Sequence, residues 1–165
     1  MRMLVSGLLA IGLTSNVAAA QCARPVDYPA LDVAALKSKL MVTALTCSAD
    51  EKYNAFITKY RPELASQDKA LSSFFSRAGG RRARQEQDGY ITQLANSQSQ
   101  TGLSQGSLFC RYNLGTFDEV LALRSGAELT DFAAGKSILQ PVVAPECAAA
   151  PAPATRSRTR TRRRS

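Results

Sequence analysis

Hydrophobic residues recur at intervals of three and four along most of the chain. The first such series consists of Leu36, Leu40, Thr43 and Cys47, at spacings of four, three and four. These residues share one side of an α-helix, because a helix completes a turn every 3.6 residues. The series predicts a first helix over residues 32–46, with the aspartate at its start as the N-cap.

Five further helices follow from the same periodicity. Ser48 and Glu51 have the spacing of a capping box, which predicts the start of the second helix. Pro62 interrupts the pattern because proline lacks a backbone donor and clashes with the preceding turn. Gly79 and Gly80 favour another break, since each glycine costs about 1 kcal/mol in a helix interior; one long helix through both is the alternative. The predicted helices cover residues 48–61, 62–78, 81–97, 103–123 and 127–134, with a turn over residues 98–102.

Signals for β-strands are sparse. Val142 and Val143 are the only β-branched pair after Gly135, and prolines flank them on both sides. Helical spacing recurs in the other segments, and the connections between them are short. We therefore predict an all-α fold, a small antiparallel bundle of five to six helices.

The N-terminal residues 1–20 have the pattern of a secretory signal peptide. Arg2 precedes an apolar run from Leu4 to Leu13, and three alanines precede Gln21. The run is too short to cross a membrane, which takes about 20 apolar residues. We predict export to the periplasm or the extracellular space, a helical domain over residues 21–143, and no transmembrane segment.

Export would place the four cysteines in an oxidising compartment, where an even number implies disulfides. Four cysteines allow three connectivities. We favour a nested pairing, in which Cys47 with Cys110 staples the helical block and Cys22 with Cys147 joins its two ends. A zinc site is disfavoured because the chain has no C-x-x-C spacing and no histidine. We predict no metal and no cofactor.

The positive charge is concentrated at the C-terminus. The chain has 21 basic and 13 acidic residues. Residues 144–165 form an Ala- and Pro-rich spacer followed by a basic tail, which we expect to be disordered when free. Six arginines lie in the last eleven positions, namely Arg156, Arg158, Arg160, Arg162, Arg163 and Arg164.

These six guanidinium groups are the predicted anion-binding residues. They suit a polyanion such as nucleic acid or acidic polysaccharide, or an anionic membrane surface. No aromatic residue lies among them, so stacking on bases is not predicted. The alternative is a solvated tail that only keeps the protein soluble.

Two patterns bear on catalysis. The segment from Gly102 to Gly106 matches the G-x-S-x-G motif, but no strand precedes it and the chain has no histidine to serve as the base. Acid–base catalysis by carboxylates is the other route, and it needs two carboxylates that face one cleft. Acidic residues that are adjacent or two positions apart on a helix point in different directions. We predict no catalytic residue. The neighbouring acids considered are Asp50 with Glu51, Glu86 with Asp88, and Asp118 with Glu119.

Two clusters have both a functional and a structural interpretation. Arginines around the Gly79-Gly80 pair fit an anion site at a helix start or a solvated helix connection. An aromatic series fits the wall of a ligand pocket or an ordinary core. The arginines are Arg77, Arg81, Arg82 and Arg84, and the aromatic residues are Tyr53, Phe56, Tyr60, Phe74 and Phe75.

The stretch from Tyr53 to Arg77, continued by Gly106 to Cys110, resembles a family of small exported alphaproteobacterial proteins of unknown function. The resemblance covers about the middle half of the chain and implies no catalytic residue. We predict an exported, non-enzymatic helical module that binds an anionic partner through its tail. The alternatives are a periplasmic ligand- or protein-binding adaptor or inhibitor that uses the helical domain, and a carboxylate-dependent hydrolase.

Overall fold

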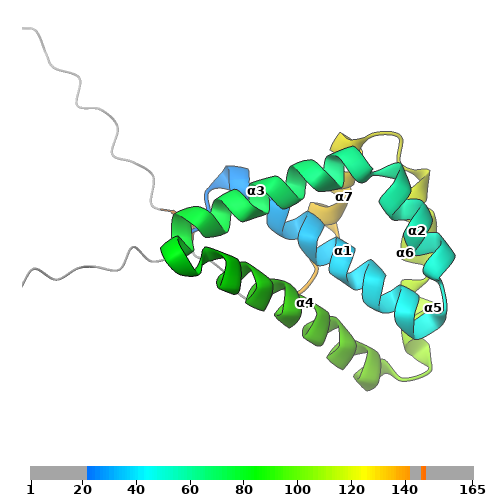
Figure 1. The fold of residues 1–165 in the computed structure, drawn as a ribbon. Coiled ribbons are helices and arrows are strands. Elements are labelled where there is room, and N and C mark those ends of the chain that lie inside the picture. The colour runs from blue at the N-terminus through cyan, green and yellow to red at the C-terminus, as the bar shows by residue number, and fades with distance from the viewer. Residues whose placement is uncertain (1–21, 142–145, 148–165) are drawn as a thin grey trace, which may run out of the picture.

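The computed structural model describes residues 22–141 and 146–147 of the chain, and in this part the fold is all-α (Figure 1). The predicted fold class is confirmed. One isolated parallel bridge, between Ala23 and Glu146, is the only β-type pairing in the described residues. Val142 and Val143 lie outside them. The helical segments are η1 (Pro25–Asp27), α1 (Tyr28–Cys47), α2 (Asp50–Lys59), α3 (Arg61–Gly79), η2 (Gly80–Arg82), α4 (Ala83–Gln105), α5 (Leu108–Asn113), α6 (Gly115–Ala122) and α7 (Gly126–Gly135).

Helix α1 is the centre of the fold. Figure 1 shows it running between α3 and α4, and it also packs against α2, α5 and α7. Eleven of its twenty residues are buried, and they lie on all sides of the helix rather than along the single predicted stripe. A helix that is apolar all round is one that other elements enclose.

The buried side chains form two clusters that α1 joins. In the first, Leu36 and Leu40 pack with Phe56 of α2, Phe117 of α6 and Leu129 of α7. The second cluster lies between α1, α3 and α4. Its largest members are Leu31, Leu71, Phe74, Phe75, Tyr90 and Leu94. The two clusters are why helices far apart in the sequence hold together around α1.

Helix α1 begins at Tyr28, so the predicted N-cap at Asp32 is wrong. Pro29 lies in the first turn, where a missing N–H donor costs nothing because that donor has no partner in a helix. The side chain of Asp32 instead accepts a hydrogen bond from Nε2 of Gln140 at 3.2 Å. This contact fastens the segment after α7 onto α1.

The predicted capping box at Ser48 and Glu51 is also wrong. Ser48 has a left-handed backbone with φ of 53°, and its N–H bonds to the carbonyl oxygen of Ala44. The residue thus ends α1 and does not cap the next helix. Helix α2 begins at Asp50 with no side-chain cap.

Two predicted breaks are confirmed and one predicted turn is wrong. The chain breaks at Tyr60, between α2 and α3, and again at Gly80, whose φ is 52°. A single long helix through the two glycines is therefore excluded. Helix α4 runs through the predicted turn at residues 98–102 and ends only at Gly106, where φ is 53°.

The predicted helix over residues 103–123 is divided between α5 and α6. At Leu114 the N–H of Phe117 bonds three residues back to the Leu114 carbonyl, not four, at 3.1 Å. The change of direction lets Cys110 of α5 reach α1 while Phe117 enters the first core cluster. Periodicity alone does not show such a break because the apolar spacing continues across it.

The nested disulfide pairing is confirmed. Cys47 at the end of α1 is bonded to Cys110 in α5, and Cys22 is bonded to Cys147. Beside the second bond, the N–H of Cys147 donates to the carbonyl oxygen of Ala23 at 3.0 Å. The two ends of the described chain are thus held together. Within the described residues no helix is long and apolar enough to cross a bilayer.

A buried carboxylate joins the N-terminal segment to α3. Asp27 is 4% exposed, and its Oδ2 accepts hydrogen bonds from the backbone N–H of Arg24 at 2.9 Å and from Arg77 at 2.7 Å. Burial alone would raise the pKa of Asp27, but the hydrogen bonds from Arg24 and Arg77 and the charge of Arg77 outweigh it and lower the pKa below its usual value.

We expect Asp27→Asn to lower the free energy of unfolding by about 1–3 kcal/mol at neutral pH. Because the folded pKa is depressed, this contribution is present above about pH 4 and is lost as the pH falls through the folded value. Urea unfolding between acidic and neutral pH should therefore show a steeper acid loss in the natural protein than in the variant. Parallel curves would contradict the assignment.

Candidate functional site

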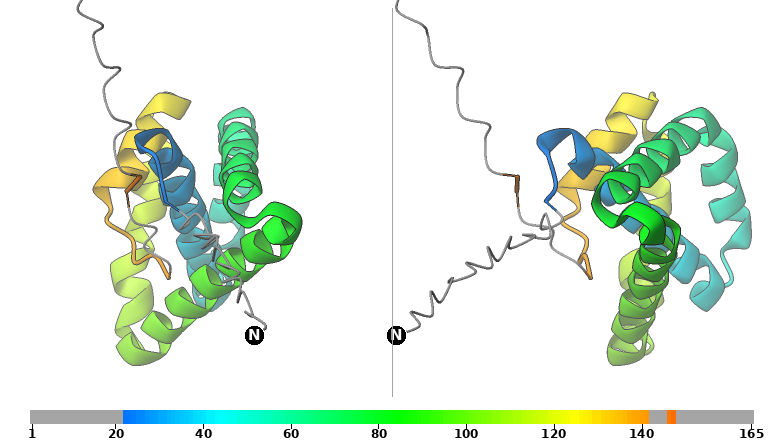
Figure 2. Two further views of the ribbon diagram at one scale, coloured as in Figure 1. Left: turned by 90° about the vertical axis from the view of Figure 1, so that its left-hand side faces the viewer. Right: turned by 60° about the vertical axis from the view of Figure 1, so that its left-hand side comes forward.

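The six arginines predicted to bind anions, Arg156 to Arg164, lie outside the described residues. The structure does show where the chain leaves the fold toward them. Cys147 is bonded to Cys22. Arg24, which lies two residues after Cys22, pairs with Asp27. Arg77 near the end of α3 pairs with the same carboxylate. Figure 1 shows the last described residue at the same end of the molecule as η2, and the left view of Figure 2 shows the two on opposite sides of that end.

Four arginines surround this end, and the structure divides their roles. Arg77 is held by Asp27 and is a structural residue. Arg81 and Arg82 in η2 and Arg84 in the first turn of α4 are exposed, and none forms an ion pair with a described residue. These three exposed side chains, Arg81, Arg82 and Arg84, are called the arginine triad below.

The local backbone explains why the arginine triad is exposed. Gly80 reverses the chain in a conformation that other residues rarely adopt, so η2 projects beyond the ends of α3 and α4. Glu86 turns back toward Gly79, where a Cβ would lie 2.6 Å from its carboxylate. The triad also lies at the start of α4, where the helix dipole adds positive potential.

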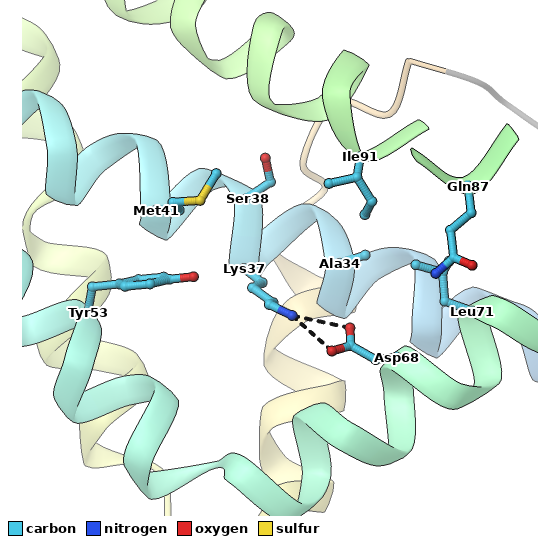
Figure 3. A pocket seen from close by; sticks show the side chains of 9 residues that line it. All are labelled: Ala34, Lys37, Ser38, Met41, Tyr53, Asp68, Leu71, Gln87 and Ile91. Atoms are coloured by element: carbon cyan, nitrogen blue, oxygen red, sulfur yellow. Dashed lines mark hydrogen bonds and ion pairs between the residues drawn. The ribbon is translucent and has the colours of Figure 1, made fainter. Parts of the chain in front are cut away.

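A pocket of about 300 Å³ lies between α1, α2, α3 and α4 (Figure 3). Its apolar wall consists of Ala34, Met41, Leu71 and Ile91. The polar side chains around it are Lys37, Ser38, Tyr53, Asp68 and Gln87.

An ion pair crosses the pocket from α1 to α3. Nζ of Lys37 lies 2.9 Å and 3.2 Å from the two carboxylate oxygens of Asp68. The side chains are 34% and 53% exposed, so both charges remain accessible from solvent. Tyr53 of α2 points its ring into the same space, and burial followed by the negative charge of Asp68 raises its pKa. Its hydroxyl therefore stays protonated and can donate.

The aromatic series divides between the two interpretations. Four of its members are buried core residues, namely Phe56, Tyr60, Phe74 and Phe75. The Tyr60 hydroxyl donates a hydrogen bond to the Val120 carbonyl oxygen at 2.7 Å. Tyr53 is the member that lines the pocket. Sequence reasoning missed Lys37, Ser38 and Asp68, because the spacing along α1 does not show which residues of α3 lie opposite.

The G-x-S-x-G motif lies within the last turn of α4. Ser104 donates its hydroxyl to the Thr101 carbonyl at 2.9 Å, and no strand in the described residues precedes it. Gly102 faces the Phe109 ring, with 3.7 Å from a built Cβ to the nearest ring carbon. The motif is a helix end and a packing contact.

Asp118 and Glu119, which are neighbours in sequence, are directed to separate partners. Asp118 pairs with Lys52 of α2, and Glu119 pairs with Lys136 beyond α7. The two carboxylates therefore do not face a common cleft, as the helix geometry predicted.

No protein-family model, curated protein or solved structure matches the chain. The resemblance to small exported alphaproteobacterial proteins stays a prediction, and the proposals below depend on the chemistry of this chain.

Proposed function

We propose that the protein is an exported, non-enzymatic helical module that binds a polyanion through its basic end, defined as the arginine triad together with the six arginines of the C-terminal tail. The observation that carries this proposal is the position of the triad. Its three exposed guanidinium groups have no ion-pair partner among the described residues, and they lie at the end of the molecule that also contains Cys147, after which the chain continues to the tail. Export is supported by the two disulfides, which persist in oxidising compartments.

The rest of the protein has little net charge to attract an anion. Without the arginine triad, residues 21–154 contain 11 basic and 13 acidic residues, a net charge of −2. Long-range attraction must therefore come from the basic end. Arginine suits phosphate and sulfate groups because its planar fork can bond two oxygens at once. Without interleaved aromatic residues the interaction reads charge density and not base sequence.

Deleting residues 155–165 should remove most of the salt-sensitive binding to duplex DNA. Each phosphate contact contributes about −0.9 to the slope of log K against log salt, so nine arginines predict a slope near −8 and the triad alone near −3. Fluorescence anisotropy with labelled duplex measures both slopes. Heparin and anionic vesicles in parallel assays show which source of closely spaced anions binds best.

A tail in which all six arginines are replaced by lysine is the matched control, because it keeps the charge and should keep the slope. A deletion variant with the affinity and slope of the natural protein would show that the tail only solubilises, and the proposal would then be withdrawn.

A further inference from the structure

Two exposed apolar side chains lie beside the basic end. Val26 in η1 is 69% exposed, and Tyr28, the first residue of α1, is 37% exposed. Neither residue belongs to the two core clusters. Single exposed apolar side chains are common on protein surfaces, so the neighbours of these two decide what they are able to do.

Helix η1 lies between the two groups of arginines. Cys22, which precedes it, is bonded to Cys147, after which the chain continues to the tail. Asp27 accepts a hydrogen bond from Arg77 at 2.7 Å, which holds η1 against the end of α3, and η2 with its two arginines follows α3 directly. The left view of Figure 2 looks onto this end, with η1 in blue between the last described residue and η2 in green.

The charge around η1 is positive even after its carboxylates are counted. Asp27 is one buried acid shared by Arg24 and Arg77, so this group keeps one positive charge. The arginine triad adds three positive charges and the tail adds six. Four further carboxylates belong to the first turns of α1 and α4 or to the segment before Cys147, namely Asp32, Glu86, Asp88 and Glu146. The whole end therefore has a net charge of +6.

Positive charge beside exposed apolar side chains suits a surface that has anions above an apolar layer. Duplex DNA and acidic polysaccharides present charged and polar groups, so they would leave Val26 in water. An anionic lipid bilayer offers phosphate groups to the arginines and acyl chains to the apolar side chains. Tyrosine is favoured at this depth, because its ring is apolar and its hydroxyl reaches the headgroups.

We propose that the polyanion bound by the basic end is the surface of an anionic lipid bilayer. The arginines pair with lipid phosphates, while Val26 and Tyr28 enter the boundary between headgroups and acyl chains. The fold then stands on the membrane with the start of α1 toward the lipid and α5 away from it (Figure 1). This inference rests on the proposed function and names the source of its anions.

A tryptophan placed in η1 reports the depth of contact directly, because the natural chain has no tryptophan. When Val26→Trp binds vesicles of phosphatidylglycerol and brominated phosphatidylcholine, its emission should shift to the blue and be quenched. Leu103→Trp is the matched control, since this exposed residue lies near the end of α4, at the far end of the molecule from η1. A bound Val26→Trp protein without quenching, or equal quenching at both positions, would overturn the proposal.

A double variant separates lipid contact from charge. V26S/Y28S should bind phosphatidylglycerol vesicles about tenfold more weakly in a sedimentation assay, because it loses apolar burial. Its affinity for duplex DNA and the salt slope should not change, since no charge is removed. L103S/Y112S is the control, because it removes exposed residues of the same kinds from α4 and α5 and should leave both affinities unchanged. Natural urea midpoints in both variants confirm that the folds are intact.

The remaining outcomes distinguish this inference from the proposed function. If the natural protein binds duplex DNA with the expected slope and V26S/Y28S keeps full vesicle binding, polyanion binding stands and the lipid contact is wrong. If V26S/Y28S loses affinity for single-stranded DNA and not for vesicles, Tyr28 stacks on bases and the lipid contact is again wrong. If duplex DNA, heparin and anionic vesicles all fail to bind the natural protein, both proposals are withdrawn.

Discussion

Replacing Cys47 and Cys110 together by alanine is expected to lower the free energy of unfolding by about 4 kcal/mol. The disulfide joins residues 63 positions apart, and closing a loop of that length removes much of the entropy of the unfolded chain. It also fixes the end of α1 against α5, where Ser48 and Gly106 turn the chain in left-handed conformations. Without the bond, these turns must form against a larger conformational entropy.

Urea unfolding of the double variant beside the natural protein measures this effect. The natural protein treated with a reductant provides an independent comparison, because it opens both disulfides without changing the sequence. A loss below about 1 kcal/mol in the double variant would show that the bond adds little to packing that is already complete.

Leu40→Ala is expected to be the most damaging single substitution on α1, with a loss of about 2–5 kcal/mol. Leu40 is fully buried in the first core cluster, beside residues of α2, α6 and α7. Removing its side chain leaves a cavity that several helices would have to close at once. The loss of packing would be felt in every element of that cluster.

Leu45→Ala is the matched control. Leu45 lies on the same helix but is 69% exposed, so truncation there should change stability by no more than about 0.5 kcal/mol. Thermal and urea unfolding of both variants should separate them clearly. Equal losses would mean that α1 is not the enclosed centre of the fold.

The sequence was most informative where one local cause decides the structure. Pro62 and Gly80 end their helices for reasons that their own chemistry supplies, and both breaks were predicted. The cysteine pairing was also predicted, because the nested arrangement is the one that closes the helical block within the two chain ends.

Errors arose where a local signal competed with packing. Serine is a common N-cap residue, which is why Ser48 suggested the start of a helix. In the structure Ser48 ends α1 instead, and its backbone is in the left-handed region. Glycine at position 102 suggested a turn, but contact with the Phe109 ring makes its small size useful inside α4. Neither competition is visible from residue spacing.

The pocket was only partly predictable. Tyr53 was identified through its place in an aromatic series, although four other members of that series are core residues. The Lys37–Asp68 pair joins residues 31 positions apart, and the register between α1 and α3 that brings them together is a property of the whole fold. The unpartnered state of Ser38 likewise depends on its surroundings, since serine in a helix ordinarily bonds its own backbone.

In the proposed function, the folded arginine triad and the tail act as one anion-binding end. The most direct measurement is the salt dependence of duplex DNA binding by an R81Q/R82Q/R84Q variant of the intact chain. The control variant R61Q/R111Q/R124Q removes the same charge from exposed arginines elsewhere on the fold.

We expect the first variant to reduce the magnitude of the slope by about 3 and the control variant to leave it unchanged. Equal reductions in both variants would show that only net charge matters. An unchanged slope in the first variant would show that the tail binds alone, and either result would contradict a shared basic end.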